Sequence, residues 1–264
     1  MINESQNKLE ENSGLEWQVV IKDDQIELSN YDKTWKRFLP SGFYNCSING
    51  NVCHTCGYPK KSNLPGTECW REANHEKLVD ADGVFQIGFY YNEKSKEKEK
   101  MDDKLSQHIN NISKDPKFVT PLALAMFEVA QTKYQELLEA DFIIPIPSYY
   151  KNKKVLLKKA DILAPELHKF FDNNGKRAKL VRCIKKTQNV EMQKLTWDSN
   201  MKPEEIAGMI NDAYKVSDNV NISGKKVLLV DNNLTTGLTA GICAKMLKTQ
   251  GAEKVWVFVA GRRK

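Results

Sequence analysis

The chain has 264 residues, of which 41% are hydrophobic and 28% charged, which is typical of one large globular domain or of a domain with a smaller module. Its 14 glycines and 9 prolines exclude collagen-like and low-complexity proteins, and the absence of 18 consecutive apolar residues excludes a transmembrane helix. The polar, acidic start of the chain carries no secretory signal, so we expect a cytoplasmic protein without a membrane partner.

The amino-terminal part is predicted to contain short strands and turns. Residues 15–28 predict one or two short strands, residues 40–69 a turn-rich region, and residues 83–91 an aromatic and β-branched strand. Residues 92–104 are almost all polar, which indicates a solvated connection or the exposed start of a helix.

The carboxyl-terminal part alternates between helices and strands. Helices are predicted at residues 119–138, 155–171, 202–214 and 238–250. Strands are predicted at residues 141–147, 179–184, 225–231 and 254–260. Because the strands are continuously apolar and separated by helices, the sequence predicts an α/β fold with a parallel sheet flanked by helices.

The net charge of +6 comes from 40 basic and 34 acidic residues and is concentrated in one segment. Residues 151–194 contain 13 basic and 4 acidic residues, a composition that attracts phosphates, a nucleotide or a polynucleotide. A solvated lysine-rich face is the structural alternative. Only 6 of the basic residues in the whole chain are arginines, which weakens the case for reading DNA bases, because such contacts favour the planar guanidinium.

Residues 227–239, VLLVDNNLTTGLT, combine a buried strand, an acid, a Thr/Gly loop and the start of a helix. Backbone N–H groups at a helix N-terminus attract anions, threonine hydroxyls add donors, and a glycine permits a tight turn. The residues that form this cradle are Thr235, Thr236, Gly237, Leu238 and Thr239. Asp231 is placed to accept hydrogen bonds from sugar hydroxyls. Together these features predict a site for a ribose 5-phosphate at the carboxyl end of a strand.

This segment resembles the phosphoribosyl pyrophosphate (PRPP) motif of type I phosphoribosyltransferases, which has a hydrophobic strand, two acids, two variable residues and then Thr-Thr-Gly and Thr. Over residues 44–264 the chain is similar to ComF-type proteins, in which a cysteine-rich zinc module precedes the transferase domain. The strand DFIIPIP at residues 141–147 resembles the first strand of that domain. The resemblance implies three parts, which are an amino-terminal extension with a zinc module (1–91), a charged connection (92–118) and a phosphoribosyltransferase-like domain (119–264).

The resemblance also implies an activity, which is the Mg²⁺-dependent transfer of a phosphoribosyl group from PRPP to a nitrogenous acceptor with release of pyrophosphate. Asp231 and Asn232 occupy the positions of the paired catalytic acids, and Lys151 lies in the turn expected to bind pyrophosphate. Asn232 departs from the motif, because an amide brings no charge to the transition state, and losing one such group costs about 3 kcal/mol. Binding of PRPP or a nucleotide is therefore better supported than catalysis.

Four of the six cysteines fall within 24 residues and predict a structural zinc site. They are Cys46, Cys53, Cys56 and Cys69. The run from Cys53 to Gly57 matches half of a zinc knuckle, in which two thiolates lie on a tight turn. His54 and His75 are alternative ligands, and unrelated reduced thiols are the alternative to a metal site. Without an export signal, a disulfide framework is not expected.

Three functions stay open at this point. The chain is an enzyme, a PRPP or nucleotide sensor without turnover, or a DNA-uptake or nucleic-acid-processing accessory that uses its zinc module and basic segment. A protein partner at the zinc module and a homodimer are further expectations.

Overall fold

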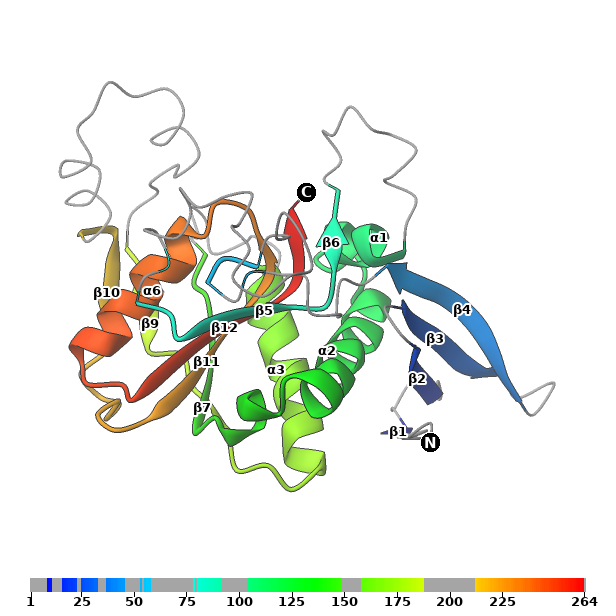
Figure 1. Cartoon of the computed structure of the whole chain (residues 1–264), viewed down its shortest axis with the longest axis horizontal. Coiled ribbons are helices and arrows are strands. Elements are labelled where there is room, and N and C mark those ends of the chain that lie inside the picture. The colour runs from blue at the N-terminus through cyan, green and yellow to red at the C-terminus, as the bar shows by residue number, and fades with distance from the viewer. Residues whose placement is uncertain are drawn as a thin grey trace.

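The computed structural model describes residues 9–10, 16–22, 25–32, 37–45, 53, 55–57, 78, 80–91, 104–148, 158–187 and 212–263. Within these ranges the chain forms a six-stranded sheet, a four-stranded antiparallel sheet and a two-stranded ribbon (Figure 1). No helix within them is long and apolar enough to cross a membrane.

The six-stranded sheet has the order β5-β12-β11-β7-β8, with β6 also beside β12, and all of its pairings are parallel. Its strands are β5 (Gly83–Gln86), β6 (Phe89–Tyr90), β7 (Phe142–Pro145), β8 (Lys179–Leu180), β11 (Lys226–Leu234) and β12 (Lys254–Arg263). The predicted parallel sheet is thus confirmed. Two of the strands, β5 and β6, come from the range 1–91 that the sequence assigns to the amino-terminal part.

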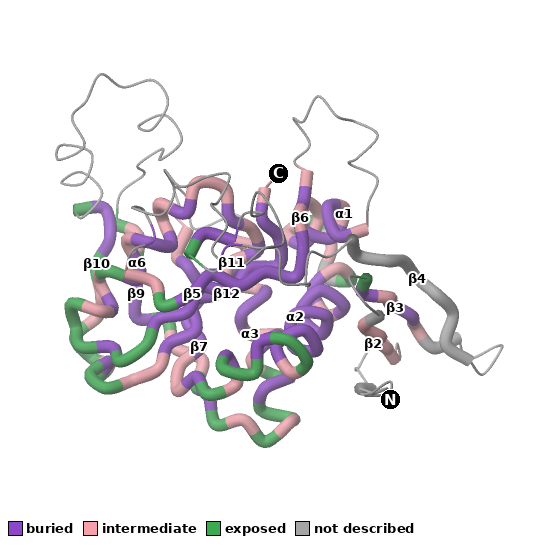
Figure 2. The backbone as a smooth tube through the Cα atoms, viewed as in Figure 1, coloured by how far each residue is buried: buried purple, intermediate pink, exposed green. Residues whose placement is uncertain are grey.

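Helices cover both faces of this sheet, which explains the uniformly apolar central strands (Figure 2). On β11, Leu228 and Val230 face the core shared with three helices, whereas Val227 and Leu229 face the core shared with a fourth. All four side chains have no exposed surface, and burying each contributes about 1.5–3 kcal/mol. β12 alternates in the same way, so these two strands form the centre of the molecule.

The helices are α1 (Lys104–Asn111), α2 (Val119–Lys133), α3 (Lys159–Asn173) and α6 (Leu238–Thr249). Two 3₁₀ turns, η4 (Pro116–Phe118) and η5 (Gln135–Glu139), flank α2. α2 and α3 pack through Phe127 and Phe171, whose ring centroids are 5.5 Å apart. The structure places Pro165 inside α3, where it leaves the carbonyl of Asp161 without its helical donor, and Arg182 Nη2 donates to that carbonyl at 3.3 Å.

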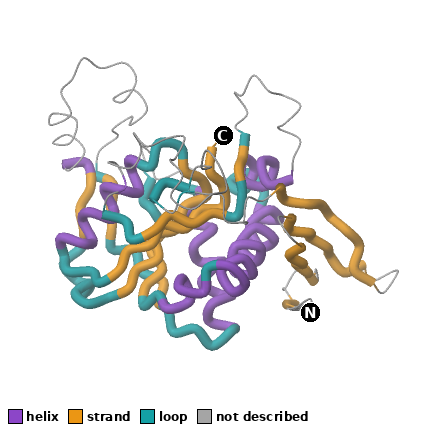
Figure 3. Tube along the Cα trace, in the orientation of Figure 1, coloured by secondary structure: helices purple, strands orange, loops and turns teal. Residues whose placement is uncertain are grey.

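The antiparallel sheet consists of β1 (Leu9–Glu10), β2 (Glu16–Lys22), β3 (Gln25–Asp32) and β4 (Arg37–Asn45) (Figure 3). Residues 15–28, for which the sequence predicts one or two short strands, contribute to two strands, because β2 and β3 pair as a hairpin. The prediction of turns after residue 40 is wrong for residues 40–45, which continue β4 because the strand pairs with β3. The ribbon pairs β9 (Ile184–Lys186) with β10 (Tyr214–Val216). Of the helix predicted at residues 202–214, Asp212 and Ala213 are helical, whereas Tyr214 already belongs to β10. Most of that predicted helix lies outside the described residues.

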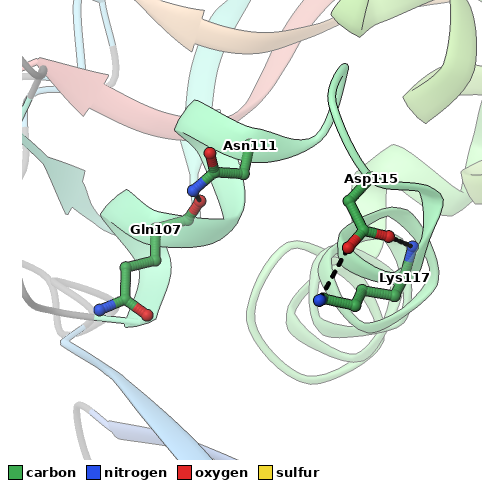
Figure 4. Close-up of polar contacts among 4 residues, drawn as sticks. All are labelled: Gln107, Asn111, Asp115 and Lys117. Atoms are coloured by element: carbon green, nitrogen blue, oxygen red, sulfur yellow. Dashed lines mark hydrogen bonds and ion pairs between the residues drawn. The ribbon is translucent and has the colours of Figure 1, made fainter.

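Side-chain caps shape the turn between α1 and α2 (Figure 4). Asn111 Nδ2 donates to the carbonyl of Gln107 at 2.9 Å near the end of α1. Asp115 Oδ1 accepts the backbone N–H of Lys117 at 3.1 Å, and its other carboxylate oxygen forms an ion pair with the Lys117 ammonium at 2.7 Å. This aspartate therefore starts the short 3₁₀ turn that leads into α2.

Two aspartates each bind the neighbouring strand at the point where a parallel pair begins. Asp141 Oδ2 accepts the N–H of Lys226 at 2.8 Å, and the Asp141 N–H donates to the Lys226 carbonyl at 2.8 Å. Asp82 does the same with Val255, at 2.6 Å and 2.7 Å. Because parallel strands lack a hairpin turn that would set their register, these reciprocal bonds help to fix it.

Replacing Asp141 with alanine is expected to lower the free energy of unfolding by about 1–3 kcal/mol, because the N–H of Lys226 loses its acceptor at the start of the sheet. Urea denaturation measures the change. Asp141→Asn keeps an acceptor oxygen and should lose less, and Asp218→Ala, an exposed turn aspartate, is the matched control. Equal stability of Asp141→Ala and wild type would contradict the assigned role.

Candidate functional site

The Thr-Gly loop, residues 235–239, joins the end of β11 to α6 at the carboxyl edge of the parallel sheet. β11 is longer than the predicted strand at residues 225–231, because Asn233 still pairs with Gly261 and Leu234 with Arg262 on the extended β12. Asp231 therefore lies within the strand rather than at its end. The ladder of strand pairing stops at Leu234, and the loop follows at once.

Gly237 makes the turn into α6 with a φ of +85°, a left-handed conformation that favours glycine. Its carbonyl accepts the first helical bond, from the N–H of Gly241 at 2.8 Å. The Thr236 hydroxyl accepts the N–H of Leu238 at 3.4 Å, which caps the helix locally. The tight turn predicted from the sequence is thus present, and it presents the remaining groups of the loop at a helix N-terminus.

Asp231 and Asn232 lie side by side before the loop, at the positions that the sequence singled out. Asp231 Oδ1 accepts the backbone N–H of Asn232 at 2.8 Å, and Asn232 is 7% exposed. Burial raises the pKa of the Asp231 carboxyl to about 7, and the negative charge of Asp161 adds to this rise. The backbone N–H of Asn232 and the positive charge of Lys159 act to lower the same pKa. Because Lys159 and Asp161 lie in the first turn of α3, the amino end of that helix faces the carboxyl end of β11.

Two buried tyrosines lie near the threonines of the loop, and the sequence did not assign either of them to the site. Tyr90 on β6 accepts a hydrogen bond from Asn233 Nδ2 at 2.6 Å, and burial raises the pKa of this tyrosine above its usual value, while the nearby Thr235 hydroxyl acts to lower it. Burial raises the pKa of Tyr214 on β10 to about 12, while the nearby Thr239 hydroxyl acts to lower it. A sequence signal existed for Tyr214, because the stretch NDAYKV resembles a pattern of the ComF-type proteins in which an Asn is followed by an aromatic residue and, two positions later, by Val.

The amino-terminal part also reaches the loop, through Leu78. This side chain has no exposed surface, and a Cβ placed on Gly237 would lie 2.7 Å from its Cδ1. Leu78 shares a hydrophobic cluster with Cys53 and Cys56 and with Leu234 at the end of β11. The turn that carries the two cysteines therefore belongs to the same packed unit as the loop.

The cysteine turn has the local geometry expected of half a zinc knuckle. Cys53 and Cys56 are buried, Gly57 has a φ of +71°, and its N–H donates to the Cys53 carbonyl at 2.7 Å. Burial raises the pKa of the Cys53 thiol, but hydrogen bonds from the backbone of Cys56 and Thr55 outweigh it, so the net shift is downward. A lowered pKa favours the thiolate, which is the metal-binding form.

Several predicted site residues lie outside the described part of the chain. They are Cys46, His54, Cys69, His75 and Lys151. The described residues contain no group of three or more His, Cys, Asp or Glu side chains that could hold a metal ion. Ile146, directly after β7, still lies beside β11, because its N–H donates to the carbonyl of Val230 at 2.9 Å, next to Asp231.

No protein-family model and no curated protein matches the chain in sequence. Solved structures that it resembles include the hypoxanthine-guanine phosphoribosyltransferase of L. donovani, at 10% identity and a TM-score of 0.37, over 54% of this chain and 70% of that one. The hypoxanthine phosphoribosyl transferase of Trypanosoma cruzi has 14% sequence identity and a TM-score of 0.35. A hypoxanthine-guanine phosphoribosyltransferase of Bacillus anthracis has 16% sequence identity and a TM-score of 0.32. Each of these two overlaps covers 52% of this chain, and the chain spans only 63% of either enzyme.

Replacing Gly237 with alanine is expected to destabilise the protein by about 1–2 kcal/mol from the left-handed backbone alone, with a further loss from the contact with Leu78. Thermal unfolding of Gly237→Ala, Leu78→Ala and the double variant separates the two effects. The double variant should be more stable than the sum of the single losses predicts. Additive losses would show that Leu78 does not press on the loop.

Proposed function

We propose that the chain binds PRPP or a nucleotide 5′-phosphate at the Thr-Gly loop and transfers the phosphoribosyl group to a nitrogenous acceptor, with release of pyrophosphate. One observation carries this proposal. An acid, a left-handed glycine and three threonines meet where β11 enters α6, at the carboxyl edge of a parallel sheet. Ligands of open α/β sheets bind at this edge.

The groups of the site match the parts of a ribose 5-phosphate. The amino end of α6 and the threonine hydroxyls supply hydrogen-bond donors for the phosphate. Asp231, four residues before Thr235, supplies acceptors for the ribose hydroxyls. Leu238 replaces the lysine of other phosphate loops, so the loop itself has no positive side chain. Phosphate binding then depends on backbone and hydroxyl donors.

Mg²⁺ fits this site as an ion that comes with PRPP. It is usually bound by one or two carboxylates together with the phosphates and water. Asp231 is the one carboxylate of the segment from Asp231 to Thr239, so oxygen atoms of the pyrophosphate and of water would supply the other ligands of the ion. When bound, the ion would neutralise the charge of the leaving pyrophosphate, while Asp231 and the loop hold the sugar.

Asn232 favours a second candidate function, which is binding without turnover. Its side chain is neutral and buried, so the site offers one carboxylate where the motif it resembles has two. Stabilisation of positive charge at the reacting carbon is then weaker than in a two-acid site. A sensor of PRPP or nucleotides needs only binding groups such as Asp231 and the threonines of the loop.

Calorimetric titration of PRPP with and without Mg²⁺ tests binding, and pyrophosphate release in the presence of a set of nucleobases tests turnover. We expect micromolar, Mg²⁺-dependent binding that Asp231→Ala weakens at least tenfold, with Asp218→Ala, which removes an exposed carboxylate in a turn, as the control. Binding without pyrophosphate release would select the sensor. No binding at millimolar PRPP would exclude both functions, and salt-sensitive DNA binding would then support a nucleic-acid accessory.

We also propose that the cysteine turn binds a structural zinc ion through Cys53 and Cys56, completed by Cys46 and Cys69. The support is that both described thiols are buried on a Cys-x2-Cys-Gly turn and that the pKa of Cys53 is shifted toward the thiolate. Four protein ligands would make the ion structural rather than catalytic. Because the turn packs with Leu78 against the loop, the ion would stabilise one wall of the ligand site.

Metal analysis of the purified protein is expected to find one zinc ion per chain, and Cys53→Ser or Cys69→Ser should reduce that content to near zero. Cys243→Ser, which removes a buried thiol of α6, is the matched control and should keep the metal. A metal-free wild-type protein with four freely titratable thiols in this region would contradict the zinc site.

A further inference from the structure

A lysine of α3 brings a positive charge to the carboxyl edge of the sheet, although it is remote from the Thr-Gly loop in the chain. Lys159 is the first residue of α3 and is half-buried. Its ammonium donates to the carbonyl of Ile109, in the last turn of α1, at 2.7 Å. A cation is stabilised at this end of a helix, because the carbonyl groups there carry partial negative charge. The ammonium is thus anchored at a defined place.

The packing of Ile109 places this ammonium close to the candidate site. A Cβ on Gly261 would lie 2.5 Å from Ile109 Cδ1, so the isoleucine side chain packs on β12 at this residue. Gly261 pairs with Asn233, which comes two residues after Asp231 on β11. The pKa of the Asp231 carboxyl responds to the same lysine, because the positive charge of Lys159 acts to lower it. Packing and electrostatics therefore both place the ammonium near Asp231.

Lys159 and the Thr-Gly loop approach Asp231 from opposite faces of the sheet. The loop leads into α6, which packs in the hydrophobic cluster on one face. The helix α3 packs in the cluster on the other face, through Leu163 and Leu167. A ligand that has its sugar at Asp231 and a phosphate in the loop therefore extends its other end toward α3. PRPP carries its 5′-phosphate and its pyrophosphate at opposite ends of the ribose, so its pyrophosphate would lie on the side of Lys159.

We infer that Lys159 binds the pyrophosphate group of PRPP while the Thr-Gly loop binds the 5′-phosphate, so that this lysine selects PRPP over ligands with a single phosphate. The inference rests on the proposed binding function. The pyrophosphate carries several negative charges, and the loop itself has no positive side chain. An ammonium has three N–H donors, and a charged phosphate oxygen is a stronger acceptor than a carbonyl. The lysine adds a cation from α3 to the turn at Lys151, to which the resemblance assigns the same group.

The test is the effect of Lys159→Met on the affinities for PRPP and for ribose 5-phosphate, measured by calorimetry in the presence of Mg²⁺. Methionine keeps much of the aliphatic stem but removes the charge. Losing a hydrogen bond between two charged groups should weaken binding of PRPP about 10- to 100-fold. Binding of ribose 5-phosphate should stay close to that of wild type, because this ligand has no phosphate on the side of α3.

Two further variants separate the charge of Lys159 from its bond to Ile109. Lys159→Gln keeps a donor for the carbonyl without the charge, whereas Lys159→Arg keeps both. We expect Lys159→Gln to bind PRPP as weakly as Lys159→Met, and Lys159→Arg to approach the affinity of wild type.

Lys248→Met is the matched control for these variants. Lys248 Nζ also donates to a backbone carbonyl, that of Glu253, at 2.9 Å. It lies ten residues after Leu238 on α6, which is about 15 Å along the helix from the loop. This variant removes the same charge far from the site and should bind PRPP as wild type does.

Unchanged PRPP affinity in Lys159→Met, or wild-type affinity in Lys159→Gln, overturns the inference while the binding function stands. An equal loss for ribose 5-phosphate or in Lys248→Met also overturns it. If wild type does not bind PRPP, the proposed function fails, and the inference fails with it. Should Lys159→Met not fold, or should wild type bind PRPP but not ribose 5-phosphate, the comparison of Lys159→Gln with Lys159→Arg decides, and equal affinities of these two variants contradict the inference.

Discussion

The parallel pairing of β11 with β12 is the constraint on which the rest of the structure depends. The two strands stay in register from Lys226 and Lys254 to Leu234 and Arg262. Their side chains enter the hydrophobic clusters on both faces of the sheet, so the α2–α3 layer and α6 both pack on this pair. Shifting one strand by a single residue would exchange its two faces and disrupt both clusters.

The same pairing builds the candidate site. Because β12 continues to Arg263, it keeps β11 extended past Asp231 and brings β6 to the carboxyl edge of the sheet. Tyr90 reaches the Thr-Gly loop from β6, and Tyr214 reaches it from the ribbon of β9 and β10. The loop therefore lies between side chains from two elements that are distant from it in the chain.

The site has few charges for a place that would hold a polyphosphate. One carboxylate precedes the loop, the next two residues are asparagines, and Leu238 stands in the loop itself. Buried neutral donors can still bind an anion well, because hydrogen bonds to a charged group are stronger in a site of low dielectric. The amino-terminal part adds to this seclusion, since Leu78 packs on Gly237 and joins the cysteine turn to the loop.

The sequence by itself determined the local features of this protein. Continuous apolar runs gave the parallel strands, and the order of acid, threonines and glycine gave the turn into α6, because both follow from residues adjacent in the chain. The hydrogen bond between Asn233 and Tyr90 joins residues that are 143 positions apart in the chain. The strand β4 forms in a region rich in turn residues because it pairs with β3. Such contacts depend on which strands become neighbours, so only the tertiary structure decided them.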